Sequence, residues 1–292
     1  MNKTFFVAGG DLRQIYAAEK LAENFSVYVT GFDRNIIIPE SINIIDNISS
    51  IPERADYLLL PMPVSTDGIT LNAPYCKSSI PINNLTSAIK ENGTVFGGKI
   101  EYDIKNIFTS SNLEVSDYLN REEFSVLNAV PTAEGAIQIA FEELATTIYG
   151  SEVLVMGFGR ISKILIKILN SLGANVTVTA RKYYDLTWAE INGCKTIHIS
   201  DLDKSVNSFN IIFNTIPCVI LNDIILKKIK KDCLVIDLAS KPGGVDFKAA
   251  SELGVKVVWA LGLPGKVAPI SAGRIIADTV MNILSERGLT YE

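Results

Sequence analysis

SEVLVMGFGRISKILIKILNSLGANVTVTAR, residues 151–181, contains the strongest structural signal in the sequence. A short apolar strand, Val153–Met156, leads into the glycine pair Gly157 and Gly159. A helix with apolar residues at helical spacing follows, and a second strand spans Val176–Thr179. This succession of strand, glycine turn, helix and strand is typical of a dinucleotide-binding βαβ unit.

Each part of that unit suits a pyrophosphate. Gly157 permits the tight turn, Gly159 lets the backbone approach the ligand, and the helix N-terminus presents N–H groups to an anion. The third small position is Ser162 instead of glycine, which is still small enough for close helix–strand contact. The alternative is a plain strand–helix turn. The predicted cofactor contacts are Gly157, Phe158, Gly159, Arg160 and Ile161.

The end of the second strand bears on the choice between NAD and NADP. An NAD site usually has an acidic residue there, but this chain has Ala180, Arg181 and Lys182. The guanidinium of Arg181 is able to pair with a 2′-phosphate, although an ordinary solvated arginine is the alternative. We therefore predict NADP as the cofactor, with NAD still possible.

Composition excludes several classes of protein. The chain has 292 residues, of which 48% are hydrophobic, so two cores are feasible. Its net charge of −5 argues against a nucleic-acid partner. The start of the sequence resembles a strand instead of a signal peptide, and no apolar run is long enough for a membrane span. Four scattered cysteines indicate buried thiols in a reducing cytoplasm, without a metal site.

Strands alternate with helical stretches along the whole chain, which predicts parallel sheets. We expect an α/β fold of two Rossmann-like doubly wound domains with a cleft between them. The first, a flavodoxin-like substrate domain, covers residues 1–130 and is completed by a helix over residues 270–292. A bridging helix covers residues 131–150, and the NAD(P)-binding domain covers residues 151–269.

Two places in the first domain are candidate substrate contacts. In Gly9–Arg13, Asp11 suits the N-cap of a helix, and Arg13 lies where cation and helix dipole both favour a carboxylate; a surface charge is the alternative. The polar loop after the strand Tyr57–Leu60 offers Ser65 and Thr66, which could equally be turn formers.

The bridging helix supplies two further candidates. Thr132 suits its N-cap and Glu134 its first turn, so capping alone would explain both residues. If that N-terminus faces the cleft, Thr132 and Glu134 are candidate substrate contacts.

Later strands of the second domain end in turns on the cofactor side. Thr215, Ile216 and Pro217 should lie across the cofactor from the glycine turn, and Leu238 and Ala239 follow the next strand. Gly262 follows the last strand and is a candidate substrate contact.

The only histidine, His198, lies far in sequence from the nicotinamide-side turns, so we interpret it as structural. Hydroxy-acid dehydrogenases need a proton partner for an alkoxide, and the stretch Trp259–Gly273 supplies no histidine for it. Oxidation of a partly unsaturated ring fits better, because aromatisation drives it and the protein mainly aligns a ring carbon with the nicotinamide. Glu134 or a water is the candidate base.

Taken together, the motifs resemble the family of dipicolinate synthase A subunits over nearly the whole length. The resemblance rests on G-G-D-x-R at 9–13, N-x-x-P-T-x-E-G at 128–135, G-x-G-R at 157–160, N-T-I-P at 214–217, D-L-A-S-x-P-G-G-x-D-F-K at 237–248 and G-L-P-G-x-V-A-P-x-x-A-G at 262–273. The family also looks like a relative of the two-domain hydroxy-acid dehydrogenases.

The resemblance implies NAD(P)-dependent oxidation of dihydrodipicolinate to dipicolinate, in the mother cell of a sporulating bacterium and beside the flavoprotein-like B subunit of the synthase. A substrate with two carboxylates suits Arg13 and Lys241, although Lys241 stands where relatives can carry arginine, which removes the planar fork. A homodimer is possible. The alternatives are a 2-hydroxy-acid dehydrogenase and a non-catalytic nucleotide-binding protein.

Overall fold

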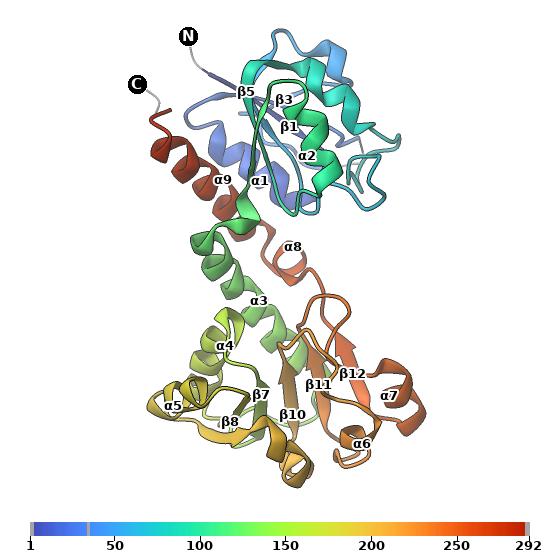
Figure 1. Cartoon of the computed structure of the whole chain (residues 1–292), viewed down its shortest axis with the longest axis vertical. Coiled ribbons are helices and arrows are strands. Elements are labelled where there is room, and N and C mark those ends of the chain that lie inside the picture. Colours follow the sequence, from blue (N-terminus) through green and yellow to red (C-terminus); the bar gives the residue numbers. More distant parts are fainter. Residues whose placement is uncertain (1–2, 34–35, 290–292) are drawn as a thin grey trace. The chain divides into compact units, whose positions relative to one another are not determined.

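A computed structural model describes residues 3–33 and 36–289. The chain divides into two compact units, each built around one sheet (Figure 1). Unit 1 consists of Met1–Leu127 and Ala268–Glu292, and unit 2 is Asn128–Val267. The first unit is therefore discontinuous in sequence.

The sheet of unit 1 has six strands in the order β3-β2-β1-β4-β5-β6. All neighbours are parallel, so the chain winds outward from β1 in one direction and then from β4 in the other. The sixth strand was not expected, because it is short and polar at both ends. The strands are β1 Thr4–Ala8, β2 Ser26–Thr30, β3 Asn43–Ile44, β4 Ala55–Leu59, β5 Ile89–Gly97 and β6 Glu114–Asp117.

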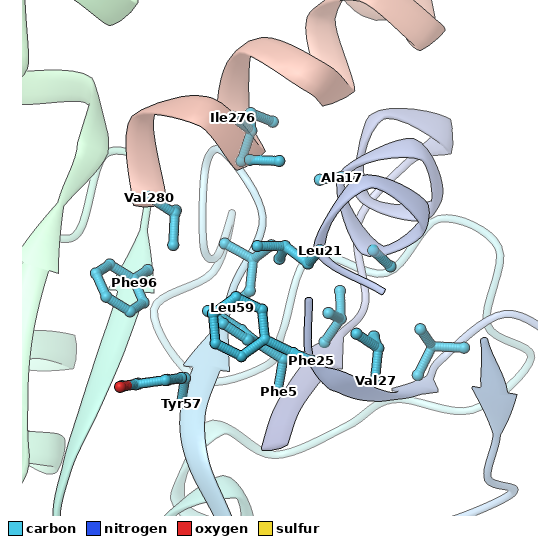
Figure 2. Packing of buried hydrophobic residues seen from close by; sticks show 14 of the residues in the cluster. Phe5, Ala17, Leu21, Phe25, Val27, Tyr57, Leu59, Phe96, Ile276 and Val280 are labelled. Carbon is cyan, nitrogen blue, oxygen red and sulfur yellow. The ribbon is translucent and has the colours of Figure 1, made fainter. Parts of the chain in front are cut away.

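Two helices from opposite ends of the sequence cover one face of this sheet. They are α1, Leu12–Leu21, and α9, Pro269–Glu286. Figure 2 shows Ile276 and Val280 of α9 and Leu21 of α1 directed toward Phe5 and Phe96 of the sheet. Burial of these apolar side chains stabilises the unit, so the C-terminal helix belongs to its core.

The crossing of α1 and α9 is close because α9 has a glycine at the contact. A Cβ added to Gly273 would lie 2.5 Å from the carbonyl oxygen of Arg13 and 2.9 Å from the backbone nitrogen of Ala17. Contacts this short do not occur, so any larger residue would push the helices apart.

Unit 2 repeats the same topology, in the order β12-β11-β10-β7-β8-β9 with every neighbour parallel. The prediction of two doubly wound parallel sheets is confirmed. The strands are β7 Glu152–Met156, β8 Asn175–Ala180, β9 Lys195–His198, β10 Ile211–Asn214, β11 Leu234–Asp237 and β12 Lys256–Trp259.

The other helices connect these strands. They are α2 Tyr102–Thr109, α3 Glu122–Glu143, α4 Arg160–Ser171, α5 Tyr183–Ile191, α6 Asp223–Leu226, α7 Phe247–Leu253 and α8 Leu263–Val267. Short 3-10 turns occupy η1 Ile48–Ser50, η2 Ile82–Ala88, η3 Tyr118–Asn120, η4 Ile199–Lys204 and η5 Val206–Ser208.

The bridging helix begins earlier than expected. Helix α3 starts at Glu122 and carries Pro131 in its interior, so the helix does not begin near residue 131. Thr132 is consequently not an N-cap: its hydroxyl donates to the carbonyl oxygen of Asn128, 2.8 Å away, one turn back in the same helix. A proline followed by threonine resembles a helix start, although proline also occurs inside helices, where it removes one backbone hydrogen bond and its ring crowds the carbonyl of the preceding turn.

Within the described residues, no helix is both long and apolar enough to cross a bilayer. All four cysteines are free thiols, but only Cys194 and Cys233 are buried, so the prediction of buried thiols is wrong for the half-buried Cys76 and the exposed Cys218.

Candidate dinucleotide site in unit 2 and polar site in unit 1

The glycine turn after β7 is held by backbone and side-chain contacts. Gly157 has a φ of 94°, and its N–H donates to the carbonyl oxygen of Thr179, 2.8 Å away. A Cβ added to Gly157 would lie 2.6 Å from the hydroxyl oxygen of Thr215. Both the left-handed backbone and the lack of space require glycine here.

A chain of hydroxyl groups ties this turn to the neighbouring strand. The hydroxyl of Thr215, after β10, donates to the carbonyl oxygen of Met156 at 2.8 Å. It therefore accepts from the Ser162 hydroxyl at 2.9 Å, and Ser162 is fully buried. Serine at the third small position thus adds a hydrogen bond, and Thr215 supports the turn from β10.

Gly159 differs from Gly157 because it faces open space. It is the N-cap of α4, has a φ of −85°, and a Cβ added to it would meet no atom within 4 Å. A glycine cap has no side chain to accept from the first N–H groups of the helix. This combination of approachable backbone and helix N-terminus is an anion-binding arrangement.

The other predicted residues of the turn surround this cap. Phe158 is half-buried, and the Lys163 ammonium lies 5.4 Å from the centre of its ring. Arg160 is exposed as the first residue of α4, and Ile161 is half-buried against the unit 2 core. The exposed cations place positive charge around the predicted pyrophosphate position.

The end of β8 carries two exposed cations after a buried Ala180: Arg181 and Lys182. The ring of His198 contacts the backbone here, with Nε2 3.0 Å from the carbonyl oxygen of Arg181 and Nδ1 2.7 Å from the Ser200 hydroxyl. His198 thus has the structural role expected of it, and it steadies the turn that carries Arg181.

Two buried polar residues that sequence reasoning missed organise the loops after β10 and β11. The carboxylate of Asp237 accepts from the Asn214 amide at 2.8 Å and from the backbone N–H groups of Ala239 at 3.1 Å and Gly244 at 2.8 Å. Asn214 in turn accepts from the N–H of Ile216 at 3.1 Å. The sequence signal for these residues was a polar side chain at the end of an otherwise apolar strand, which occurs in β10 and again in β11.

Asp237 and Asn214 therefore fix the positions of several predicted contacts. Ile216 is half-buried, and Leu238 and Ala239 are almost fully buried, while Pro217 is exposed. Farther along the loop after β11, Lys241 is exposed, and Gly262, which follows β12, is also exposed and has a φ of 68°.

In unit 1, Arg13 is not a surface charge. Its side chain is only 12% exposed and is paired with Asp11, the N-cap of α1, whose carboxylate also accepts from the backbone N–H of Arg13. The closest approach of the two side chains is 2.8 Å, and the same Arg13 nitrogen donates to the carbonyl oxygen of Met62 at 3.2 Å. The pair lies after β1, next to the point where the winding of the sheet reverses between β1 and β4.

In the loop after β4, the hydrogen bonds of Ser65 agree with the interpretation of this residue as a turn former. That side chain is 6% exposed; its hydroxyl lies 2.6 Å from the carbonyl oxygen of Thr70 and accepts from the N–H of Gly68 at 2.9 Å. Thr66 is exposed. Ser65 is therefore engaged within its own loop, and Thr66 is the more accessible of the two candidates.

Glu134 lies exposed in the interior of α3, and not in its first turn as predicted, in the part of that helix that belongs to unit 2. Its carboxylate makes no hydrogen bond or ion pair to another described residue. Among residues 3–33 and 36–289 no group of histidine, cysteine and acidic side chains is arranged to hold a metal ion.

Comparison with known proteins places these motifs in one family. Residues 4–119 match the family model that describes the N-terminal domain of the dipicolinate synthase A subunit. The A subunit of dipicolinate synthase from Bacillus subtilis (strain 168) is 32% identical over 285 residues, which cover 96% of this chain and 95% of that protein. The crystal structure of dipicolinate synthase, A chain, from Bacillus subtilis superposes with a TM-score of 0.87, covering 99% of this chain and 98% of the other at 32% identity.

A dehydrogenase shares the fold at greater distance. The apo-structure of D-lactate dehydrogenase from Escherichia coli has a TM-score of 0.59 and 13% identity, covering 99% of this chain and 98% of that one. The similarity is one of fold.

Proposed function

Since this chain belongs to the family of dipicolinate synthase A subunits, we propose that it is an oxidoreductase that converts dihydrodipicolinate to dipicolinate with NADP, and less readily with NAD. It acts in the cytoplasm of the mother cell of a sporulating bacterium, together with the flavoprotein-like B subunit of dipicolinate synthase. A homodimer of this chain is compatible with the proposal.

The observation that carries the proposal is the contrast between the two glycines of the turn. Gly157 is enclosed by Thr215, whereas Gly159 caps α4 and faces open space. These residues would hold the pyrophosphate, and the exposed Arg181 and Lys182 would hold the 2′-phosphate. A nicotinamide cofactor held there would supply the hydride acceptor for the oxidation of a substrate ring carbon.

The chain's own residues then have three tasks. The hydrogen-bonded loops after β10 and β11 orient the cofactor contacts Thr215, Ile216 and Ala239 without needing to move. The proposed substrate contacts are Arg13 and Thr66 in unit 1, and Lys241 and the backbone of Gly262 in unit 2. The hydroxyls of Ser65 and Thr132 donate to carbonyl oxygens nearby in the chain, so neither would have a proton left to donate to a substrate. Glu134 is the proposed base, because its carboxylate is exposed and unpaired among the described residues.

The test mixes this chain with the purified B subunit and freshly generated dihydrodipicolinate, and follows the nicotinamide absorbance for NADP and for NAD. We expect cofactor-dependent dipicolinate formation, faster with NADP at equal concentration. No reduction of either cofactor would contradict the proposal. Turnover of simple 2-keto acids by this chain alone would instead indicate a hydroxy-acid dehydrogenase.

The B subunit could in principle carry all the chemistry, with this chain only binding nucleotide. Replacing Gly159 by valine in this chain separates the two cases, because a bulky side chain at that open position would displace the cofactor. Loss of activity of the two-protein mixture supports catalysis on this chain, whereas unchanged activity supports the binding role.

A further inference from the structure

Unit 1 has a cavity of its own beyond the carboxyl ends of β2 and β3. Its volume is about 370 Å³, and the residues that follow both strands line it. Small-molecule pockets of proteins measure roughly 300–1,000 Å³. Doubly wound sheets bind their ligands at this edge, and the strand order of unit 1 is the one that unit 2 repeats.

An acidic residue follows β2, where dinucleotide-binding folds have the carboxylate that binds a ribose. Strand β2 ends at Thr30, and Asp33 comes shortly after it on the wall of the cavity. The interval from Gly9 to Asp33 is close to the spacing of about 20 residues that this fold has between its glycine turn and its acid. In unit 2 the corresponding strand β8 is followed by Arg181 instead.

The carboxylate of Asp33 is held in place and still accessible. One of its oxygens accepts from the backbone N–H of Lys77 at 2.9 Å, which lowers the pKa of this carboxyl, and the Cys76 thiol acts in the same direction. Asp33 is nevertheless exposed. Each carboxylate oxygen is able to accept more than one hydrogen bond, so hydroxyl groups of a ligand can donate to Asp33 as well.

A buried hydroxyl without a partner also belongs to the cavity wall. Thr30 is 3% exposed, and its hydroxyl makes no hydrogen bond to another described residue. It is not one of the fully enclosed unpaired polar atoms of the described structure, so a ligand can reach it. Buried hydroxyls generally have a partner, and a ligand in this cavity would supply one.

The remaining wall combines a glycine with isoleucines. Gly31 has a φ of 87°, and a Cβ there would lie 3.1 Å from the Cα of Gly9 and 3.2 Å from the Cδ1 of Ile80. The backbone therefore requires glycine at this point of the wall. Ile44, Ile48 and Ile80 give the cavity an apolar surface on which a planar group can pack.

Acidic side chains determine which charge the ligand can carry. Asp46 lines the cavity together with Asp33. Asp11 follows the glycine turn directly and caps α1 by accepting from the N–H of Arg13 at 3.0 Å, so it occupies the helix N-terminus that a phosphate would need. Because like charges repel, these carboxylates favour a neutral ligand over a phosphorylated one.

We propose that this cavity of unit 1 binds a nucleoside. The Asp33 carboxylate accepts from the two ribose hydroxyls, the Thr30 hydroxyl pairs with a polar atom of the ligand, and the base packs against Ile44 and Ile80. This site belongs to unit 1, whereas the predicted dinucleotide turn belongs to unit 2. The inference therefore goes beyond the proposed function and does not depend on it.

The test titrates the full-length chain with adenosine by calorimetry, in saturating NADP so that a dinucleotide site in unit 2 is filled. Asp33→Asn is compared with Asp103→Asn, because Asp103 is an exposed acid of the same unit, in the first turn of α2, and does not line the cavity. The matched probes are 2′-deoxyadenosine, 3′-deoxyadenosine and AMP. Melting temperatures are recorded in parallel.

We expect Asp33→Asn to weaken adenosine at least about tenfold, and Asp103→Asn to bind like the unmodified chain. In the unmodified chain both deoxynucleosides and AMP should bind at least about fivefold more weakly than adenosine. In Asp33→Asn the preference for adenosine over the deoxynucleosides should disappear. An adenosine Kd above about 1 mM in the unmodified chain, or equal affinity in Asp33→Asn, would overturn the proposal.

Thr30→Val decides if Asp33→Asn does not fold. Valine has nearly the shape of threonine and removes only the unpaired hydroxyl, so the variant should keep the Tm of the unmodified chain. Adenosine bound at least about threefold more weakly supports the proposal, and unchanged affinity overturns it.

These measurements need no turnover, so the two proposals fail separately. Adenosine binding that depends on Asp33, in a chain that never oxidises dihydrodipicolinate with the B subunit, would remove the proposed function and keep the nucleoside site. Oxidation by a chain that does not bind adenosine would do the reverse.

Discussion

Alanine at the two glycines of the β7–α4 turn should impair different properties: Gly157→Ala should lower stability, and Gly159→Ala should lower cofactor affinity. In Gly157→Ala the new Cβ lies 2.6 Å from the Thr215 hydroxyl oxygen, and the residue must keep a φ of 94°. The left-handed backbone costs about 1–2 kcal/mol, and crowding against a hydrogen-bonded neighbour costs about 1–3 kcal/mol more. A total of about 2–5 kcal/mol corresponds to a fall in Tm of roughly 5–15 °C.

Gly159→Ala should leave stability almost intact. Its φ of −85° suits any residue, its Cβ meets no atom within 4 Å, and exchanging a glycine N-cap for alanine costs about 0.5 kcal/mol. If a pyrophosphate lies against this backbone, the methyl group displaces it, and NADPH affinity should fall at least tenfold, or about 1.4 kcal/mol.

The assay pairs thermal unfolding with NADPH titration followed by its fluorescence. Gly150→Ala is the matched control, because Gly150 has a φ of 74° but no atom within 4 Å of an added Cβ. The difference in Tm between Gly157→Ala and Gly150→Ala isolates the clash with Thr215. Full NADPH affinity in a stable Gly159→Ala variant would refute the placement of the pyrophosphate.

Three other substitutions or modifications probe the rest of unit 2. Arg181→Ala should weaken NADP more than NAD in parallel titrations, and an equal loss for both would exclude a contact to the 2′-phosphate. Asp237→Ala leaves the backbone N–H groups of Ala239 and Gly244 unpaired and removes one of the two acceptors of the Asn214 amide, which keeps its bond to the carbonyl oxygen of Ile216, so urea unfolding should show a loss of about 3 kcal/mol; an unchanged midpoint would argue against this network. Alkylation at pH 8, followed by mass spectrometry, should modify the exposed Cys218 first, and NADP should slow the reaction at that thiol. Burial raises the pKa of Cys233 to about 12, so this thiol should react only after unfolding. Equal rates at both thiols would contradict this order.

The βαβ unit was predictable because its signal is local. Apolar strands, paired glycines and a periodic helix lie within about thirty residues, and each follows from backbone sterics and burial. The residue that supports the turn could be predicted only in part. Thr215 was expected near the cofactor, but its hydrogen bond to Ser162 depends on how β10 pairs with β7.

The features that the sequence analysis missed or placed wrongly depend on distant parts of the chain or on ambiguous local signals. Gln14, Ala17, Ala18 and Leu21 share the buried face of α1 at helical spacing, but that face is covered by α9, which comes much later in the sequence. In the interior of α3, Pro131 and Thr132 have the composition of a helix N-terminus, and only the structure reveals that the helix begins earlier and continues through them. The strand β6 lacks an apolar run because it lies at the edge of its sheet.

The split of unit 1 between both ends of the sequence sets the order of events during synthesis. Unit 2 is one continuous segment and has all its residues once Val267 has left the ribosome. The first sheet, although translated earliest, has one face covered only by α1 until Ile276 and Val280 of α9 emerge. Until α9 is made, the N-terminal part of the chain keeps apolar surface exposed, so a premature stop codon before α9 would release a polypeptide prone to aggregation.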